Sequence, residues 1–404
     1  MSGVNTINEA WLAARGLVAG GFTDEEAIRE FEKKFAESVG TAEAISFGAA
    51  RMGLYAVLEA LDFKPDDEII LTGYTCEVVP NALVFRGLKP VYVDIDAVTF
   101  NIDAAKIEAA ITRRTRAIIM QHTFGVCADV GAIREIAEKH GLRVIEDAAH
   151  SKGTSWQGVP SGALGEVAVF STDRSKMFST LLGGMVTTSN RELARRLRKI
   201  QGNALFLDDR TVRRILFSLI FEVVFYSPQL LWLGLSVRTL GEKLGVFFYY
   251  YDLMLDAFPA NHPYPSRLSA VQARIGLSQL QIFPENLKHR REIAAWLQSR
   301  AGWYHSMAPG EQSCMRYPIL VRDSQALVQR MKKRFDLKGW CSIPYQSPAR
   351  NPENTGYTPG SCPIAEKVSR HIVTFPTHPK VPLGVIQVEW MKHEKWILEN
   401  LVRL

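Results

Sequence analysis

Three residues near the middle of the chain carry side chains capable of covalent and acid–base chemistry. Asp147 and His150 follow an apolar run that ends in "VIE", and Lys176 follows "FSTDRS" one Gly-rich crossover later. Open α/β sheets bind ligands beyond the carboxyl ends of their strands, so an acid at such an end is well placed to contact a bound molecule. Each residue alone also has an ordinary explanation, because acids cap helices and loop lysines are usually solvated. The surrounding elements decide between the two.

One cofactor requires this combination. Pyridoxal phosphate needs a lysine amine for a Schiff base, and an acid that keeps its pyridine nitrogen protonated so that the ring can accept electrons. It also needs an anion site, and "SFGAAR" places a Gly turn before an apolar helix whose first backbone N–H groups can bind a phosphate. The candidate phosphate ligands are the amides of Gly48, Ala49 and Ala50 and the hydroxyl of Ser171.

The elements that position these residues have the pattern of an α/β protein. A polar-faced helix is expected before Gly40, with Thr23 as its N-cap. Continuous Val/Ile runs then alternate with helical segments, which indicates a mostly parallel sheet buried on both faces. The expected strands lie in "AEAISF", "DEIILT", "KPVYVDID", "RTRAIIM", "LRVIED", "EVAVFST" and "GGMVTTSN". We therefore predict an α/β fold with a mixed, mostly parallel sheet of seven-stranded type.

The pattern of predicted helices and strands changes after Pro259. A long helix broken at Pro284 is expected, followed by strand–helix–strand and helix–strand segments. This pattern predicts a large domain over 1–258 and a smaller C-terminal α+β domain over 259–404.

Residues 212–251 form the most apolar stretch, and its core, 215–237, has about the length of a membrane span. Glu222 lies inside it and Pro228 divides it. Three interpretations stay open: a helical hairpin in a subunit interface, a membrane-surface patch, and a span, which the continuing fold on both sides disfavours. The basic residues flanking the stretch are Arg213, Arg214 and Arg238.

The bulk composition narrows the function classes. A net charge of +6 suits an anionic substrate, partner or membrane surface, whereas no basic block argues for nucleic acid. The five cysteines form no CxxC and no metal-type spacing, so we expect reduced thiols, no metal and a cytoplasmic protein. The N-terminus has no basic region followed by an apolar one, so no signal peptide is expected.

Several motifs resemble the DegT/DnrJ/EryC1/StrS family of fold-type-I aminotransferases, often called sugar aminotransferases, over almost the whole length. "VIEDAAH" is similar to the family's acid strand and "FSTDRSK" to its F-S-x-x-x-x-K segment. "RLSAVQARIGLSQL" is similar to its Q-A-A-x-G-L-x-Q-L helix, and "TFPTHP" to its closing L-P-x-H-P. The resemblance implies the pyridoxal-phosphate-dependent transferase fold of type I.

The resemblance also implies roles. Lys176 would form the Schiff base and move the proton between substrate and cofactor, and Asp147 would pair with the pyridinium nitrogen. His150 would lie beside the ring and its 3′-oxygen. Arg267 occupies the motif arginine position that usually reaches the partner's active site, which implies a homodimer. Cys76 stands where the family commonly has an aromatic residue stacked on the ring, and without a base beside it no catalytic thiol is expected.

Three further residues are candidates for substrate contacts. Tyr74 and Thr75 lie on a loop at the same expected edge of the sheet, and His122 follows another strand. For Thr75 a turn hydroxyl, and for His122 a structural histidine, are the alternatives.

The predicted function is transfer of an amino group, by resemblance from glutamate, to a keto- or aldehyde-sugar, nucleotide-linked or free, for cell-surface polysaccharide, lipopolysaccharide or amino-sugar synthesis. The alternatives are a sugar dehydratase on the same fold, which Lys176 disfavours because such relatives carry His there, and a non-catalytic membrane-associated relative. A dinucleotide-dependent oxidoreductase is disfavoured because "SFGAARMGL" lacks G-x-G-x-x-G.

Overall fold

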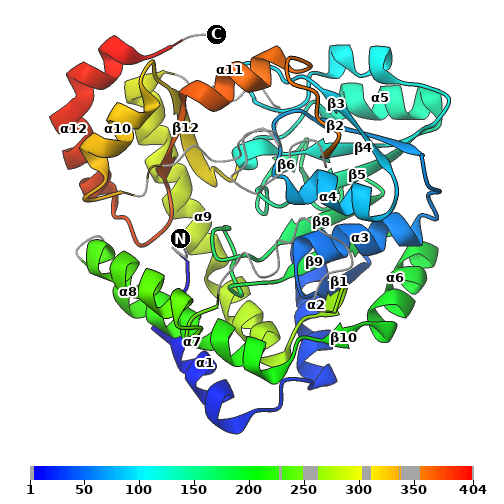
Figure 1. Ribbon diagram of the computed structural model, residues 1–404, viewed down its shortest axis with the longest axis horizontal. Helices are drawn as coiled ribbons and strands as arrows, with labels where there is room; N and C mark the ends of the chain where they lie inside the picture. The colour runs from blue at the N-terminus through cyan, green and yellow to red at the C-terminus, as the bar shows by residue number, and fades with distance from the viewer. Residues whose placement is uncertain are drawn as a thin grey trace.

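The computed structural model describes residues 4–226, 230–248, 263–302, 311–335, 337 and 355–402. Its centre is a seven-stranded sheet in the order β1-β9-β8-β5-β4-β2-β3 (Figure 1). Its strands are β1 Glu43–Phe47, β2 Glu68–Thr72, β3 Lys89–Val93, β4 Thr115–Gln121, β5 Arg143–Asp147, β8 Val167–Ser171 and β9 Gly184–Thr188. The β9 strand pairs antiparallel with β1 and β8, and the other neighbours are parallel. The predicted mixed, mostly parallel sheet is confirmed.

Alternate residues of each strand enter different cores, because successive side chains of a strand point to opposite faces. Ile119 of β4 joins the core beneath one set of helices, whereas Ile118 and Met120 join another. Both faces of the strand are therefore buried, which explains the continuous apolar runs. The helices are α1 Ile7–Ala19, α2 Glu25–Val39, α3 Ala50–Ala60, α4 Val78–Phe85, α5 Val130–His140, α6 Arg191–Asn203, α7 Asp209–Phe225, α8 Leu231–Lys243, α9 Ala270–Ala301, α10 Ser324–Met331, α11 Pro363–His371 and α12 Leu383–Asn400.

Two local expectations differ from the structure. The N-cap of α2 is Asp24 rather than Thr23, because the Asp24 carboxylate accepts from the amides of the first turn. The helix α9 runs without interruption through Pro284, where a break was expected. A proline inside a helix costs about 3 kcal/mol. Burial of both halves of α9, by Ile275 in the large core and by Leu297 in the C-terminal core, outweighs this cost.

The C-terminal part of the chain has its own small core. The strands β12 Arg316–Leu320 and β13 Ile372–Pro376 pair antiparallel. Tyr317 and Trp390 pack there against the end of α9. The expected boundary between 258 and 259 lies outside the described residues, so the division into domains stays a prediction.

The apolar stretch forms two helices, α7 and α8, and α7 packs beside α1 (Figure 1). Ile215 and Leu219 are buried in the large core. None of the helices that the structure describes is long and apolar enough to cross a membrane. The first part of the stretch is therefore a folded element of the protein body, and residues 227–229 and 249–251 lie outside the described part of the chain.

Candidate active site

The carboxyl ends of three parallel strands meet at one edge of the sheet. The β4 strand ends at Gln121, β5 at Asp147 and β8 at Ser171, and α3 begins at Ala50 beside them. Lys176 lies in the loop that joins β8 to β9. Residues that are distant in sequence are thus brought together at the edge where α/β sheets bind ligands.

A cavity of about 230 Å³ opens at this edge. It has room for a small ring compound with a charged substituent. The predicted site residues that line it are Ala49, Ala50, Cys76, Asp147, His150, Ser171 and Lys176. The two residues on which the cofactor prediction rests, Asp147 and Lys176, therefore face the same space.

The N-terminus of α3 forms one end of the cavity. Its N-cap, Ala49, has no side chain that could bond to the first-turn amides, so these donors suit an anion. The strand β9 approaches this turn so closely that a Cβ atom at Gly184 would collide with the backbone of Ala50. Gly48 differs from the expectation, since its N–H donates to the Ser266 carbonyl at 2.8 Å and it does not line the cavity.

Arg51 adds a buried positive charge to the same end of the cavity. Its side chain lines the cavity although the residue is only 7% exposed. A guanidinium at the first turn of a helix strengthens an anion site, because it adds charge-assisted hydrogen bonds to those of the amides.

The surroundings of Asp147 act on its pKa in opposite directions. Burial raises the pKa of Asp147, while a hydrogen bond from the Ala149 N–H (3.0 Å) and the positive charge of Lys176 act in the opposite direction. A carboxylate in such a place gains from a cation placed against it, because the pair offsets the loss of hydration. The position therefore suits a protonated pyridine nitrogen.

His150 is neutral in this site. Burial, together with the positive charges of Lys176 and Arg316, lowers the pKa of His150 well below its ordinary value. The Phe124 N–H donates to Nδ1 at 3.4 Å, and the two rings lie nearly parallel with centroids 6.2 Å apart. The ring proton is therefore on Nε2, and the imidazole presents a flat, uncharged face with one donor.

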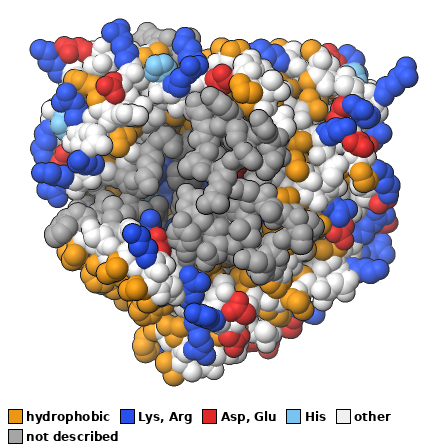
Figure 2. All heavy atoms as spheres, in the orientation of Figure 1, with side chains coloured by type: hydrophobic (Ala, Val, Ile, Leu, Met, Phe, Trp, Pro, Cys, Tyr) orange, Lys and Arg blue, Asp and Glu red, His pale blue; other side chains and the backbone are white. Residues whose placement is uncertain are grey.

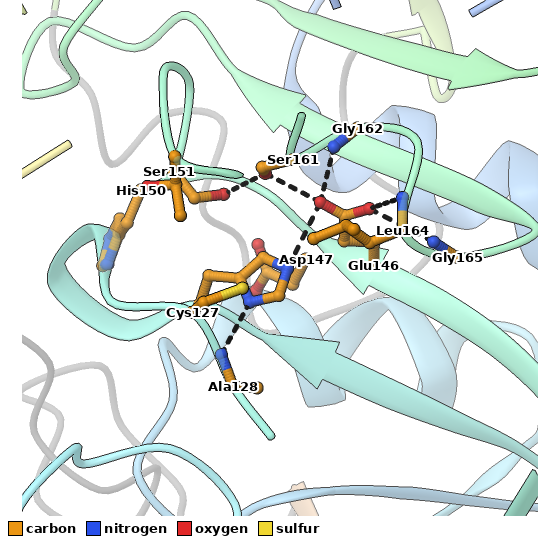
Figure 3. A network of polar contacts seen from close by, with 12 residues as sticks. Cys127, Ala128, Glu146, Asp147, His150, Ser151, Ser161, Gly162, Leu164 and Gly165 are labelled. Atoms are coloured by element: carbon orange, nitrogen blue, oxygen red, sulfur yellow. Dashed lines mark hydrogen bonds and ion pairs between the residues drawn. The ribbon is translucent and has the colours of Figure 1, made fainter. Parts of the chain in front are cut away.

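A buried network beneath the cavity holds the strand end in place (Figure 3). The carboxylate of Glu146, the residue before Asp147, accepts from the Ser161 hydroxyl (2.7 Å) and from three amides. Burial acts to raise the pKa of Glu146, but its contacts with His122 and these donors outweigh burial and lower it. The amides belong to Gly162, Leu164 and Gly165. Glu146 is thus an ionised anchor for the turn that follows Asp147.

His122 belongs to this network and does not line the cavity. The Ala128 N–H donates to its Nδ1 atom at 3.1 Å, and its Nε2 atom lies 3.2 Å from Glu146. The side chain is fully buried, which agrees with the structural alternative. The structure thus places His122 in this network, and a substrate contact of His122 stays a prediction.

The remaining predicted substrate residues also lie outside the cavity. The Thr75 hydroxyl donates to the Gln121 amide oxygen at 2.7 Å, and Tyr74 is buried among aromatic rings. Arg267 pairs with Glu25 at 2.6 Å and lies over the Phe206 ring at 4.4 Å. Thr75 therefore positions Gln121, which does line the cavity, and Arg267 contacts its own chain.

Cys76 lines the cavity as an inert group. Burial raises the pKa of its thiol, so the thiol is protonated at neutral pH and is a poor nucleophile.

Sequence reasoning missed five polar residues that line the cavity: Arg51, Gln121, Glu146, Asp173 and Ser175. For Arg51 a signal was present, since it is the one charged residue in the first turn of the helix that follows the Gly turn. The others are indistinguishable in sequence from loop and strand residues.

A lysine and an aspartate that share a cavity at the carboxyl edge of a mostly parallel sheet define an α/β enzyme of the transferase type. The chain matches the DegT/DnrJ/EryC1/StrS aminotransferase family over residues 8–219 and 245–387. The chain therefore belongs to this aminotransferase family.

Curated relatives support this family assignment. The chain is 34% identical to GDP-perosamine synthase of Caulobacter vibrioides over 68% of this chain and 61% of that protein. It is 30% identical to the spore coat polysaccharide biosynthesis protein SpsC of Bacillus subtilis over 70% of this chain and 64% of that protein. The matches thus span less than two thirds of either relative.

The PMP-form structure of Spr1654 from Streptococcus pneumoniae superposes with a TM-score of 0.76 at 20% identity, covering 98% of this chain and 97% of that one. The aminotransferase from Psychrobacter cryohalolentis gives the same TM-score at 21% identity, over 98% of both chains. The predicted type I aminotransferase fold is confirmed.

Proposed function

We propose that the protein is a pyridoxal-phosphate-dependent aminotransferase that moves an amino group from an amino acid to a keto- or aldehyde-sugar. The observation that carries the proposal is the shared cavity of Lys176 and Asp147 beside the uncapped N-terminus of α3. By family resemblance the donor is glutamate.

The residues present fit the cofactor. The cavity has an amine at Lys176, a carboxyl at Asp147 and an anion site at α3, and these are the three groups that pyridoxal phosphate requires. When bound, the cofactor supplies an electron sink for the carbon from which the amine is removed. Arg51 and the Ser171 hydroxyl would hold its phosphate, in addition to the amides of Ala49 and Ala50.

Each chain residue has a defined task in this proposal. Lys176 would carry the proton to and from the reacting carbon, Asp147 would keep the pyridine nitrogen protonated, and neutral His150 would lie beside the ring. The apolar lining from Leu54, Ile145 and Val169 excludes water and strengthens these electrostatic contacts.

The acceptor is proposed to be a sugar of a polysaccharide pathway. The names of the relatives, a GDP-perosamine synthase and a spore coat polysaccharide protein, support this class. The net charge of +6 suits a nucleotide-linked or acidic sugar, and a role in lipopolysaccharide synthesis is the finer form of the same proposal.

A sugar dehydratase on the same fold is the second candidate. The lysine at position 176 favours amine transfer, because the dehydratases of this fold carry histidine there. Product analysis separates the two, since a dehydratase releases a deoxysugar without consuming an amino donor.

We also propose that the protein acts as a cytoplasmic homodimer. Free thiols at the four described cysteines support a reducing compartment. Arg267 lies at β11 (Ser266–Arg267), within the motif that usually contacts the partner in this family. Light scattering of the purified protein tests the dimer.

The first experiment is the visible absorption spectrum of purified protein before and after glutamate, with Lys176→Ala beside the wild type. We expect a yellow band that glutamate converts to the pyridoxamine spectrum, and no such lysine-dependent band in the variant. Ping-pong kinetics with glutamate and a keto-sugar is the second readout. A wild type that shows no band after addition of pyridoxal phosphate overturns the proposal.

A further inference from the structure

Exposed apolar side chains gather on one face of the molecule, made by α1, α7 and α8. Figure 2 shows hydrophobic side chains along the lower left, where Figure 1 places these helices. We call this surface the α1/α7/α8 face. Its exposed apolar residues are Ile7, Trp11, Val18, Phe217, Val224, Val237, Leu240, Leu244 and Val246.

These residues form stripes rather than isolated points. On α8 and at its C-cap, Val237, Leu240 and Leu244 recur at helical spacing, and the two leucines are 60% and 69% exposed. On α1, Trp11 (62%) and Val18 (91%) are seven residues apart and also share a side. A contiguous apolar surface of this kind marks an interaction site, because single exposed apolar residues would be scattered.

The same face is basic. Arg15, Arg210, Arg213 and Lys243 are exposed on its helices, whereas Asp209 is the one exposed acid among the described residues of α1, α7 and α8. Arg213 donates to the backbone carbonyl of Leu17 at 2.7 Å, and Arg214 donates to that of Phe247 at 2.9 Å, so both guanidinium groups are held against the helices of this face.

A groove runs through the face and combines both properties. It has a volume of about 470 Å³. Its walls are formed by Leu17, Arg210, Arg213, Arg214, Phe217 and Val246. Guanidinium groups beside aliphatic and aromatic side chains match a surface whose charged groups lie directly over an apolar layer.

The second half of this face lies outside the part of the chain that matches the family. The match to the aminotransferase family stops at residue 219 and resumes at 245, so the end of α7 and all of α8 fall outside it. The α1/α7/α8 face shares no residue with the lining of the cavity, so it can have a function separate from amine transfer.

We propose that the α1/α7/α8 face binds the surface of an anionic lipid bilayer. The apolar stripes enter the boundary between headgroups and acyl chains, Trp11 lies at that boundary, and the basic residues contact lipid phosphates. Because none of the described helices can span a bilayer, the contact is peripheral. A second copy of this chain is the less favourable occupant, since a two-fold interface would bring the same basic surface onto itself.

The experiment is flotation of the holoenzyme with vesicles of equal parts phosphatidylcholine and phosphatidylglycerol, and with pure phosphatidylcholine. We expect binding to the anionic vesicles that weakens with salt. Leu240→Ser/Leu244→Ser should abolish it, and Arg210→Ser/Lys243→Ser should lower the partition coefficient by roughly thirtyfold, since each basic residue near such a surface contributes about a fivefold change. All four side chains are exposed, so these variants should fold.

Matched controls lie on α12 and beside α10. Met391→Ser/Leu398→Ser removes two exposed apolar residues of α12, and Lys333→Ser/Lys395→Ser removes two exposed lysines. Neither control should change vesicle binding. Equal loss in the control and test variants overturns the proposal, as does absence of binding by the wild type. Light scattering without vesicles completes the test: if Leu240→Ser/Leu244→Ser splits an oligomer, the face is a subunit interface and the lipid proposal is wrong.

Discussion

The Nη1 atom of Arg174 lies 3.1 Å from Oε1 of Glu222, and both side chains are almost fully buried. This ion pair joins the loop that carries Lys176 to the last turn of α7. It explains why an acid interrupts the most apolar stretch of the chain. Because Arg174 is two residues from Lys176, α7 holds the lysine loop against the body of the protein.

Breaking this pair should be costly. In Glu222→Gln the buried guanidinium loses its charged partner, so we expect the free energy of unfolding to fall by about 3–5 kcal/mol. Urea unfolding monitored by circular dichroism measures it. The double variant Arg174→Met/Glu222→Leu removes both charges of the pair and should recover most of the loss. A change below about 1 kcal/mol in Glu222→Gln would show that the pair is solvated.

Arg51 should act on the cofactor phosphate. We expect Arg51→Gln to weaken pyridoxal phosphate binding by about 10- to 100-fold, because it removes a charge-assisted contact in a buried site. Pyridoxal, which has no phosphate, should bind the variant and the wild type equally. Equilibrium dialysis against both compounds provides the readout, and Arg51→Lys should lie between the two proteins. Equal weakening of both ligands would mean that Arg51 only supports the fold of the cavity.

His150 should not contribute an ionisation to the pH profile. Since the pKa of His150 is held well below its ordinary value, the ring is neutral at neutral pH. His150→Gln also presents a neutral donor, so we expect the shape of the kcat/KM profile to be unchanged and the rate to fall less than about tenfold. Loss of an acidic limb in the variant would identify His150 as a titrating group and contradict this assignment.

Lys152 should make stability depend on pH. Its amine lies 4.5 Å from the Phe35 ring centroid and 5.1 Å from that of Phe283, and it donates to Ser38. Burial lowers the pKa of Lys152 from 10.5 to about 7. Between about pH 7 and pH 10.5 this lysine is protonated in the unfolded chain but neutral in the folded protein. The free energy of unfolding therefore rises with pH across this range. Below about pH 7 the folded protein has to bury the charged amine, so the full destabilisation applies there.

Lys152→Met removes this dependence. We expect the variant to be more stable than the wild type at about pH 6, and its advantage to shrink by roughly 2 to 3 kcal/mol by about pH 9. Urea unfolding at both pH values measures the difference. A variant less stable than the wild type at about pH 6 would show that the aromatic rings stabilise the cation by more than burial opposes it.

The sequence alone determined the class of fold and the chemical core of the site. Strands buried on both faces must be apolar throughout, so Val/Ile runs reveal them directly. Asp147 and Ser171 were found because each ends such a strand, and Lys176 because it follows one; the carboxyl ends of strands are the binding edge of α/β sheets. These inferences need only periodicity and order along the chain.

Tertiary structure decided everything that depends on contacts between distant segments. Only the contacts made in the folded protein distinguish a residue that lines the cavity from one that is buried. In those contacts His122 lies against Glu146, Thr75 donates to Gln121 and Arg267 pairs with Glu25. Packing likewise keeps α9 helical at Pro284, because burying its two halves in two cores stabilises the helix by more than the lost hydrogen bond destabilises it. Local sequence could not show that Glu222 forms an ion pair with Arg174, because the two residues are brought together only by the fold. A buried charge is tolerated when such a partner lies against it.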